Sequence, residues 1–230
     1  MESVFCYFCI NRKLVLTKFS DPFHKENTGF KNSIFHTMKI DSTPYEIELN
    51  PLIQSNLKKS DFDCIIDDHH SPIFKGVQYE LKILNDGLIC KNILINGLGK
   101  FTPVQEHSYA YDKQHLLICC GNKIFGLKFP ELTLDWVMQS DPVACHQIVK
   151  ISNGFIIHGE LLISKINIFG EMEWQLEFDD IIGDIIDNPS CFIVHKDYIE
   201  IHDLSDHVYF INFEGRLLEK KMYKHSSLSV

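Results

Sequence analysis

Apolar residues recur along the chain in short runs, and turn-forming residues separate these runs. The segments "SVFCYFCI" and "KLVLTKF" flank Asn11-Arg12, and "ELKILNDGLICKNILI" carries Asn85-Asp86-Gly87. A further segment, "LLICCGNKIFGLKF", turns at Gly121-Asn122. Glycine and asparagine accept positive φ, so apolar runs joined by such residues predict β-hairpins. The pattern therefore predicts a chain that is mostly β.

One segment has a helical signal instead. In "NPLIQSNLKKSDF", Asn50 has the character of an N-cap and Pro51 that of a first helical residue. This predicts one short helix near residues 50–59, with strands and turns elsewhere.

An internal repeat appears in the second half of the chain. When "LLICCGNKIFGLKFPELTLDW" is set above "GFIIHGELLISKINIFGEMEW", Trp136 aligns with Trp174 and Gly121 with Gly159, each 38 residues apart. A third, looser copy begins at "CFIVHKDYIEIHD" and runs to Lys220. Each copy holds about three to four short strands, and a period near 40 residues of this kind is typical of propeller blades.

The third copy does not keep a single shift. His195 aligns with His158 at a shift of 37, whereas Gly215 aligns with Gly170 at a shift of 45. The difference predicts an extra hairpin turn around residues 204–206. The aligned histidines suggest a repeated structural role, such as a hydrogen bond between blades.

One small sheet cannot bury its apolar face alone, so repeats of this kind must stack on one another. The sequence predicts a partial or degenerate β-propeller-like stack of antiparallel sheets. It predicts a single β-rich domain over residues 1–230, with a divergent part at 1–110 and repeats of about 38 residues at 111–221. The residues expected to hold the repeats together are Trp136, Trp174, Gly121, Gly159, Gly170 and Gly215.

The repeats resemble the blades of quinoprotein-like (PQQ-type) β-propellers, which finish in "G-x-x-x-W". Gly170 to Trp174 match this finish, whereas Leu132 stands where the glycine before Trp136 would fall. The resemblance covers about Leu116 to Lys220, and the residues that bind a quinone cofactor have no recognisable counterparts. In style the second half is also similar to small bacterial proteins encoded beside polymorphic toxins, some of which act as immunity proteins.

Charge and composition narrow the classes of partner. The formal net charge is −9, which opposes a phosphate backbone and argues against nucleic acid as a ligand. No apolar run approaches the length of about 20 residues that spans a bilayer, so no membrane association is predicted. In "MESVFCYFCINRK" the positive charge follows the apolar stretch, the wrong order for a secretory signal, which predicts a cytoplasmic protein.

The stretch with the strongest signal for a reactive site is "CIIDDHH". Its residues Asp67, Asp68, His69 and His70 are of types that bind divalent metals. Adjacent residues rarely converge on one ion, and a solvated turn before Ser71-Pro72 is the favoured interpretation. No nucleophile elbow, phosphate loop or dinucleotide fingerprint is present in the sequence. No catalytic residue, metal ligand or cofactor is therefore assigned, and no enzymatic activity is predicted.

The sequence favours a non-enzymatic protein-binding scaffold, most plausibly a bacterial immunity protein that neutralises a toxin by steric occlusion. Its partner is expected to be a protein, with a basic toxin among the candidates. The residues assigned to partner binding lie in "EFDDIIGDIIDNPS" and are Asp179, Asp180, Asp184 and Asp187. A solvated connection explains this run equally well. The alternatives are a metal-dependent hydrolase using Asp67 to His70, or a structural assembly subunit.

Overall fold

The computed structural model describes residues 8–10, 13–15, 36–39, 44–52, 58–67, 76–105, 107–183 and 191–222. The chain forms two compact units, Met1–Ile34 and Phe35–Val230. In the first unit, strands β1 (Phe8–Ile10) and β2 (Lys13–Val15) pair antiparallel, with Ile10 opposite Lys13. This pairing confirms the hairpin predicted around residues 11–12.

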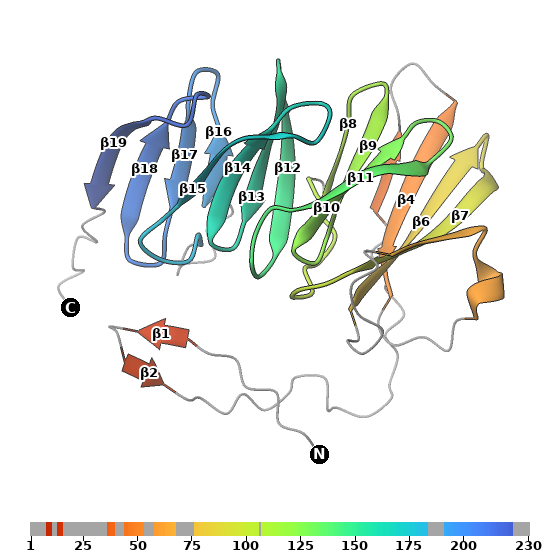
Figure 1. The fold of residues 1–230 in the computed structure, drawn as a ribbon, viewed down its shortest axis with the longest axis horizontal. Coiled ribbons are helices and arrows are strands. Elements are labelled where there is room, and N and C mark those ends of the chain that lie inside the picture. Colours follow the sequence, from red (N-terminus) through yellow and green to blue (C-terminus); the bar gives the residue numbers. More distant parts are fainter. Residues whose placement is uncertain are drawn as a thin grey trace, which may run out of the picture. The chain divides into compact units, whose positions relative to one another are not determined.

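The second unit contains one five-stranded sheet followed in chain order by three four-stranded sheets (Figure 1). The five-stranded sheet has the order β3-β4-β6-β7-β5, in which only β5 runs parallel to its neighbour. Its strands are β3 (His36–Lys39), β4 (Tyr45–Pro51), β5 (Cys64–Asp67), β6 (Val77–Asn85) and β7 (Leu88–Gly97).

Each four-stranded sheet is an antiparallel meander of consecutive strands. The first comprises β8 (Tyr109–Tyr111), β9 (His115–Cys120), β10 (Lys123–Lys128) and β11 (Thr133–Gln139). The second comprises β12 (Cys145–Ile151), β13 (Gly154–Gly159), β14 (Leu162–Ile166) and β15 (Met172–Glu177). The third comprises β16 (Phe192–Val194), β17 (Ile199–His202), β18 (His207–Ile211) and β19 (Leu217–Met222). The predicted fold class, a mostly β, propeller-like stack of sheets, is confirmed.

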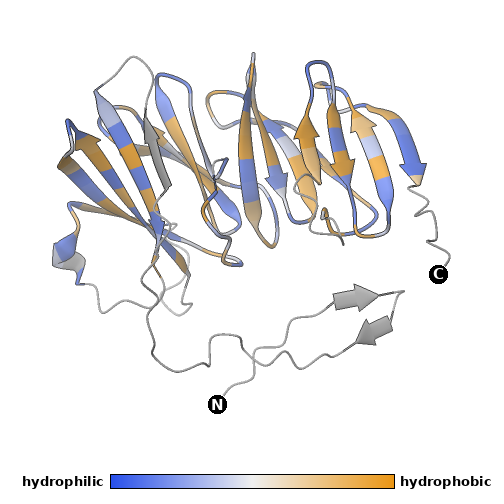
Figure 2. Cartoon of the chain, turned by 180° about the vertical axis from the view of Figure 1, so that it is seen from behind, coloured by the Kyte–Doolittle hydropathy of each residue, from blue (hydrophilic) through white to orange (hydrophobic). Residues whose placement is uncertain are grey.

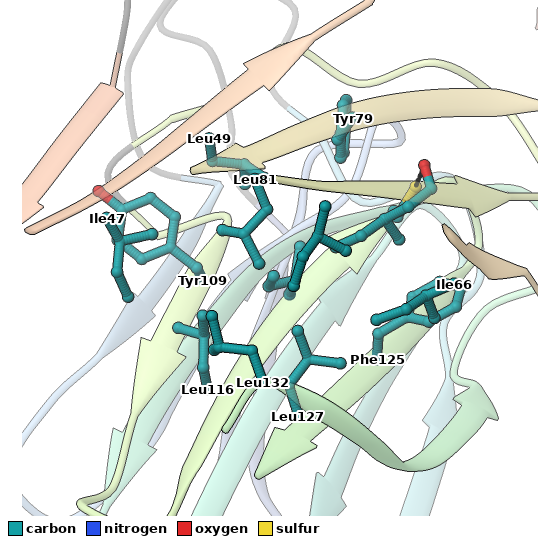
Figure 3. Packing of buried hydrophobic residues seen from close by; sticks show 14 of the residues in the cluster. Ile47, Leu49, Ile66, Tyr79, Leu81, Tyr109, Leu116, Phe125, Leu127 and Leu132 are labelled. Atoms are coloured by element: carbon teal, nitrogen blue, oxygen red, sulfur yellow. Dashed lines mark hydrogen bonds between the residues drawn. The ribbon is translucent and has the colours of Figure 1, made fainter. Parts of the chain in front are cut away.

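Three apolar cores join successive sheets. The first lies between the five-stranded sheet and β8–β11, where Leu81, Phe125 and Leu132 are among its buried members (Figure 3). The second lies between β8–β11 and β12–β15, and the third between β12–β15 and β16–β19. Along many of the strands hydrophobic and hydrophilic residues alternate, as Figure 2 shows, because successive side chains point to opposite faces.

The two outermost faces of this stack carry paired polar side chains. On the five-stranded sheet, Asn92 Nδ2 donates to Glu80 Oε1 (3.1 Å), and Lys82 pairs with the same carboxylate (2.9 Å). On the β16–β19 sheet, the two oxygens of Glu200 meet His195 Nε2 (2.9 Å) and His202 Nε2 (2.8 Å). Burial raises the Glu200 pKa, but the hydrogen bonds to His202 and His195 outweigh it, so the net pKa is lowered. Polar terminal faces are how stacked-repeat proteins end.

The structure gives the true register of the repeat. Met172 opens β15 and Leu217 opens β19, 45 residues later, and β14 and β18 are related by the same shift. The equivalence of His158 and His195 is therefore wrong, because His158 lies in β13, a second strand, and His195 follows β16, a first strand. The extra residues lie in the connection from β15 to β16, and not around residues 204–206. The sequence comparison paired His158 with His195 because "FIIH" and "FIVH" are similar.

Tryptophans connect neighbouring sheets through glycines. A Cβ added at Gly170 would lie 2.4 Å from the Trp136 ring, and one added at Gly215 would lie 2.8 Å from the Trp174 ring. Each indole therefore packs on the turn that precedes the fourth strand of the next sheet. Trp174 Nε1 also donates to the carbonyl of Phe213 (3.0 Å) across this junction.

Leu132 occupies the position that the repeat gives to glycine elsewhere. Its φ is +54°, in the same left-handed region as Gly170 and Gly215, both at +78°. Its side chain is buried in the first core. Leu132 therefore keeps the left-handed backbone conformation that glycine has in the other copies. Leucine adopts this conformation less readily than glycine, but its side chain adds apolar contact to the core.

The predicted helix near residues 50–59 is wrong at its start. Asn50 and Pro51 end strand β4, opposite Glu80 and Tyr79 of β6. Pro51 is tolerated there because a strand's terminal residue can lack the ladder N–H. The described residues include only a short 3₁₀ turn, η1 (Lys59–Asp61), and no helix among them is long and apolar enough to cross a membrane.

Candidate functional site

The three meander sheets have two distinct ends. The connections that follow β7, β11 and β15 lead from one sheet to the next and leave these strands at one end, here called the loop end. The opposite end carries the turns at 112–114, 152–153, 167–171 and 212–216, and is here called the turn end.

The loop end is joined by backbone hydrogen bonds that cross from sheet to sheet. These bonds run from Cys145 N to Gly121 O (2.7 Å), from Glu160 N to Ala144 O (3.0 Å), from Ile182 N to Glu160 O (2.9 Å) and from Leu204 N to Ile181 O (2.9 Å). Their regular succession locks each sheet-to-sheet loop to the turns beside it. The loop end therefore carries a row of backbone hydrogen bonds that joins the sheets, here called the seam.

Asp141 is the central polar residue of this seam. Its carboxylate is 1% exposed and accepts four backbone N–H groups, from Val143 (2.7 Å), Ala144 (3.0 Å), Leu161 (2.8 Å) and Leu162 (2.9 Å). A Cβ at Gly159 would lie 2.3 Å from Asp141 Oδ2, so only glycine leaves room for the carboxylate. Asp141 is thus fully used in holding two sheets together.

His158 lies beside this seam and is completely enclosed. Its ring stacks on Phe192 (centroids 4.9 Å apart) and lies 5.3 Å from the ring of His146. Neither ring nitrogen has a hydrogen-bond partner among the described residues. Burial, with a smaller contribution from His146, lowers the pKa of His158 to about 3. So weak a base cannot serve as a general base near neutral pH.

The acids assigned from sequence to partner binding belong to the loop after β15. Asp179 pairs with Lys220, and this hydrogen bond lowers the Asp179 pKa. Asp180 Oδ2 accepts a hydrogen bond from the hydroxyl of Ser205 (2.7 Å). Both described acids therefore already have partners within the chain, while Asp184 and Asp187 lie outside the described residues.

The metal-site alternative rests mostly on residues that lie outside the described part of the chain, namely Asp68, His69 and His70. Asp67 ends β5 and is exposed. Among the described residues no group of three or more histidine, cysteine, aspartate or glutamate side chains could hold a metal ion. The hydrolase hypothesis stays a prediction.

The turn end carries a groove of about 370 Å³ between the first and second meander sheets. It is lined by Asp112, Lys113, Gln114, Lys150, Ile151, Ser152, Gly154, Phe155 and Ile168. Ile151, Phe155 and Ile168 are apolar, whereas Asp112, Lys113 and Lys150 are charged. The volume is within the range of sites that accept one large side chain or a small molecule.

Two lining residues of the groove are fixed by local hydrogen bonds. Asp112 Oδ1 accepts the backbone N–H groups of Gln114 (3.0 Å) and His115 (2.7 Å), which shapes the β8–β9 turn. Lys150 Nζ donates to the carbonyl of Tyr111 (3.3 Å), which holds its stem across the sheet junction.

An exposed aromatic ring lies beside the groove, on a turn fixed by hydrogen bonds. Phe169 follows the lining residue Ile168, and 63% of its surface is exposed. Asn167 Oδ1 accepts the N–H groups of Phe169 (2.9 Å) and Glu171 (3.0 Å), and Gly170 is packed on Trp136. Phe169 is thus held out in solvent by a turn that has little freedom to move.

Groove and ring together make a surface of the kind that binds proteins. An apolar depression with a polar rim accepts an aromatic or aliphatic anchor, and a preorganised aromatic supplies one in return. Sequence reasoning missed this site, since "NIFGE" was treated only as part of the repeat. The available signal was two large apolar residues placed directly before a turn glycine.

Comparisons with known proteins bear on the fold alone. No protein-family model matches the chain, and no curated protein sequence matches it significantly. It is similar to the crystal structure of BamB from Moraxella catarrhalis (11% identity, TM-score 0.45, 80% of this chain and 60% of that one). It is also similar to the AfRom2 CNH domain (10%, 0.49, 95% and 67%) and to the computationally designed Ika8 protein (10%, 0.45, 78% and 59%). The chain thus spans about three fifths of the length of BamB and of Ika8.

Proposed function

We propose that this protein is a non-enzymatic scaffold that binds a partner protein at the turn end, through the groove and Phe169. The observation that carries the proposal is the exposed Phe169 ring on a hydrogen-bonded turn beside a groove with apolar lining. A folded chain gains little stability from an aromatic residue that is 63% exposed, because most of its apolar area stays in water. A binding partner would bury both the ring and the groove.

The proposed class of partner rests on the net charge of the chain and on the similarity of its second half to small bacterial immunity proteins. We infer that the partner is a basic toxin, which a chain of net charge −9 attracts during encounter, and that this protein is its immunity protein. Neutralisation would occur by steric occlusion, since no chemical step is required of the scaffold. This proposal includes a bacterial source, a cytoplasmic location and repeats of the quinoprotein-like type, for which the Gly170–Trp174 spacing is the support.

The test co-expresses this protein with a basic, growth-inhibiting product of a gene beside its own, which the proposal requires, and measures growth. Wild-type protein should restore growth, and Phe169→Asp should abolish the rescue because a charge replaces the apolar anchor. Phe101→Asp is the matched control, because Phe101 is also exposed (44%) but lies at the loop end. Full rescue by Phe169→Asp would refute the proposed surface.

The acidic loop is tested separately. Reversal of Asp179 and Asp180 breaks the pairs with Lys220 and Ser205, whereas Asp184 and Asp187 lie outside the described residues. If a complex with the toxin survives reversal of all four acids, the loop does not bind the partner. Loss of binding in the Asp184 and Asp187 double reversal would extend the interface to that loop.

A further inference from the structure

Strand β19 has an outer edge with which no described strand pairs. It is the last strand of its sheet, and all six of its residues are exposed, including Leu218 (58%) and Met222 (65%). The backbone N–H and C=O groups on the outer side of an edge strand are free to pair with another strand. Lysines usually protect such an edge by repulsion, and β19 contains two of them.

Both lysines are neutralised within the chain. Lys221 Nζ lies 2.8 Å from Glu219 Oε2 and 4.8 Å from the centroid of the Phe210 ring, on the outermost face of the sheet. On the opposite face, Lys220 pairs with Asp179 and lies over the Tyr209 ring. Each lysine therefore has an acidic partner within the chain, which weakens the repulsion that would protect the edge.

We propose that β19 pairs antiparallel with β19 of a second copy of this chain, about a twofold axis at Lys220. A twofold axis normal to a sheet keeps each face, so a residue can pair directly only with residues on its own face. Centred on Lys220, the register places Glu219 opposite Lys221 of the partner subunit, and the symmetric pair forms at the same time. Leu218 comes beside Met222 of the partner subunit.

Charge selects this register over its neighbours. Centring on Lys220 forms two Glu219–Lys221 pairs across the strands, and neither neighbouring register forms any. Centring on Glu219 would instead oppose two Glu219 carboxylates, and centring on Lys221 would oppose two Lys221 ammonium groups. In the proposed register the two Lys220 side chains face each other, but each is already paired with its own Asp179. The polar outermost face of this sheet, with Glu200 between two histidines, favours edge pairing over face-to-face stacking.

The experiment measures self-association of the full chain by sedimentation velocity between about 1 and 200 µM, a range suited to a small interface. The wild type should dimerise with increasing concentration. Glu219→Lys and Lys221→Glu should each raise the dissociation constant at least about tenfold, because each places like charges opposite each other twice. Glu177→Lys, the same charge change at an exposed site on β15, should have no effect.

Mixing the variants tests the register itself. An equimolar mixture of Glu219→Lys and Lys221→Glu should dimerise again, because every mismatched position in one variant faces the complementary charge in the other. The double variant Glu219→Lys/Lys221→Glu should also recover the dimer by itself. A wild type that stays monomeric at all concentrations, or a mixture that associates no more than its components, would overturn the proposal. The partner-binding proposal at Phe169 is independent of either result.

Discussion

The enclosed histidine His158 makes the stability of the protein depend on pH in a way that can be worked out from its surroundings. Its ring is 3% exposed, its nitrogens have no partner among the described residues, and its pKa falls to about 3 in the folded protein. In the unfolded chain the same imidazole has a pKa of about 6.5. The unfolded state therefore binds a proton between these two values, while the folded state does not.

The sign and size of the effect follow directly. A lowered folded-state pKa contributes stability that is complete above about pH 6.5 and is lost as the pH falls toward 3. The loss approaches about 1.4 kcal/mol per pH unit once the unfolded imidazole is mostly protonated, so lowering the pH from 6.5 to 4.5 removes about 2 kcal/mol. This is a large share of the roughly 5–15 kcal/mol that stabilises an ordinary domain.

The assay is urea unfolding, followed by the fluorescence of the two tryptophans at several pH values between 7.5 and 4.5. His158→Phe keeps a ring stacked on Phe192 and cannot titrate, so its unfolding free energy should fall by about 2–3 kcal/mol less than that of the wild type over this range. At pH 7 the variant should equal or exceed the wild type, because two unpartnered buried nitrogens are removed. His107→Gln, at an exposed turn, is the control and should behave as the wild type.

Two results would refute this reasoning. If His158→Phe loses stability in acid as steeply as the wild type, other groups cause the loss. If His158→Phe is strongly destabilised at pH 7, the imidazole nitrogens have partners that stabilise the folded state.

Two further predictions concern the left-handed turns, and thermal or urea unfolding checks both. Gly170→Ala should cost about 2–4 kcal/mol, because its Cβ meets the Trp136 ring at a positive φ, whereas Gly87→Ala, at the same φ of +78° with nothing within 4 Å, should cost only about 1 kcal/mol. Equal costs would show that the indole contact is unimportant. Leu132→Ala should cost about 2–5 kcal/mol through lost burial, and Leu132→Gly should be no worse, reversing the usual order of alanine and glycine, because only glycine relieves the positive φ. A glycine variant clearly less stable than the alanine variant would contradict the assignment of strain to this residue.

The sequence by itself determined the elements and their local turns. Short apolar runs separated by turn-forming residues predicted the strands, and Asp86-Gly87 and Gly121 predicted tight turns that the structure confirms with positive φ at all three residues. Such signals are local, because the period of a strand and the conformation of a turn depend on neighbouring residues only. The spacing of Trp136 and Trp174 likewise revealed repeating sheets, since each copy must bury the same kind of face.

Tertiary structure alone decided what lies beside what. Asn50 and Pro51 have the local character of a helix start, yet pairing with β6 places them in a strand, because long-range ladder bonds outweigh a weak local preference. His158 and His195 look equivalent in sequence, but the strand register separates them. Asp179 looks free in sequence but pairs with a lysine 41 residues away. The groove could not be predicted from the sequence, because its lining residues meet only when separate sheets stack. The β19 edge could not be predicted either, because it depends on the order of the strands in the sheet.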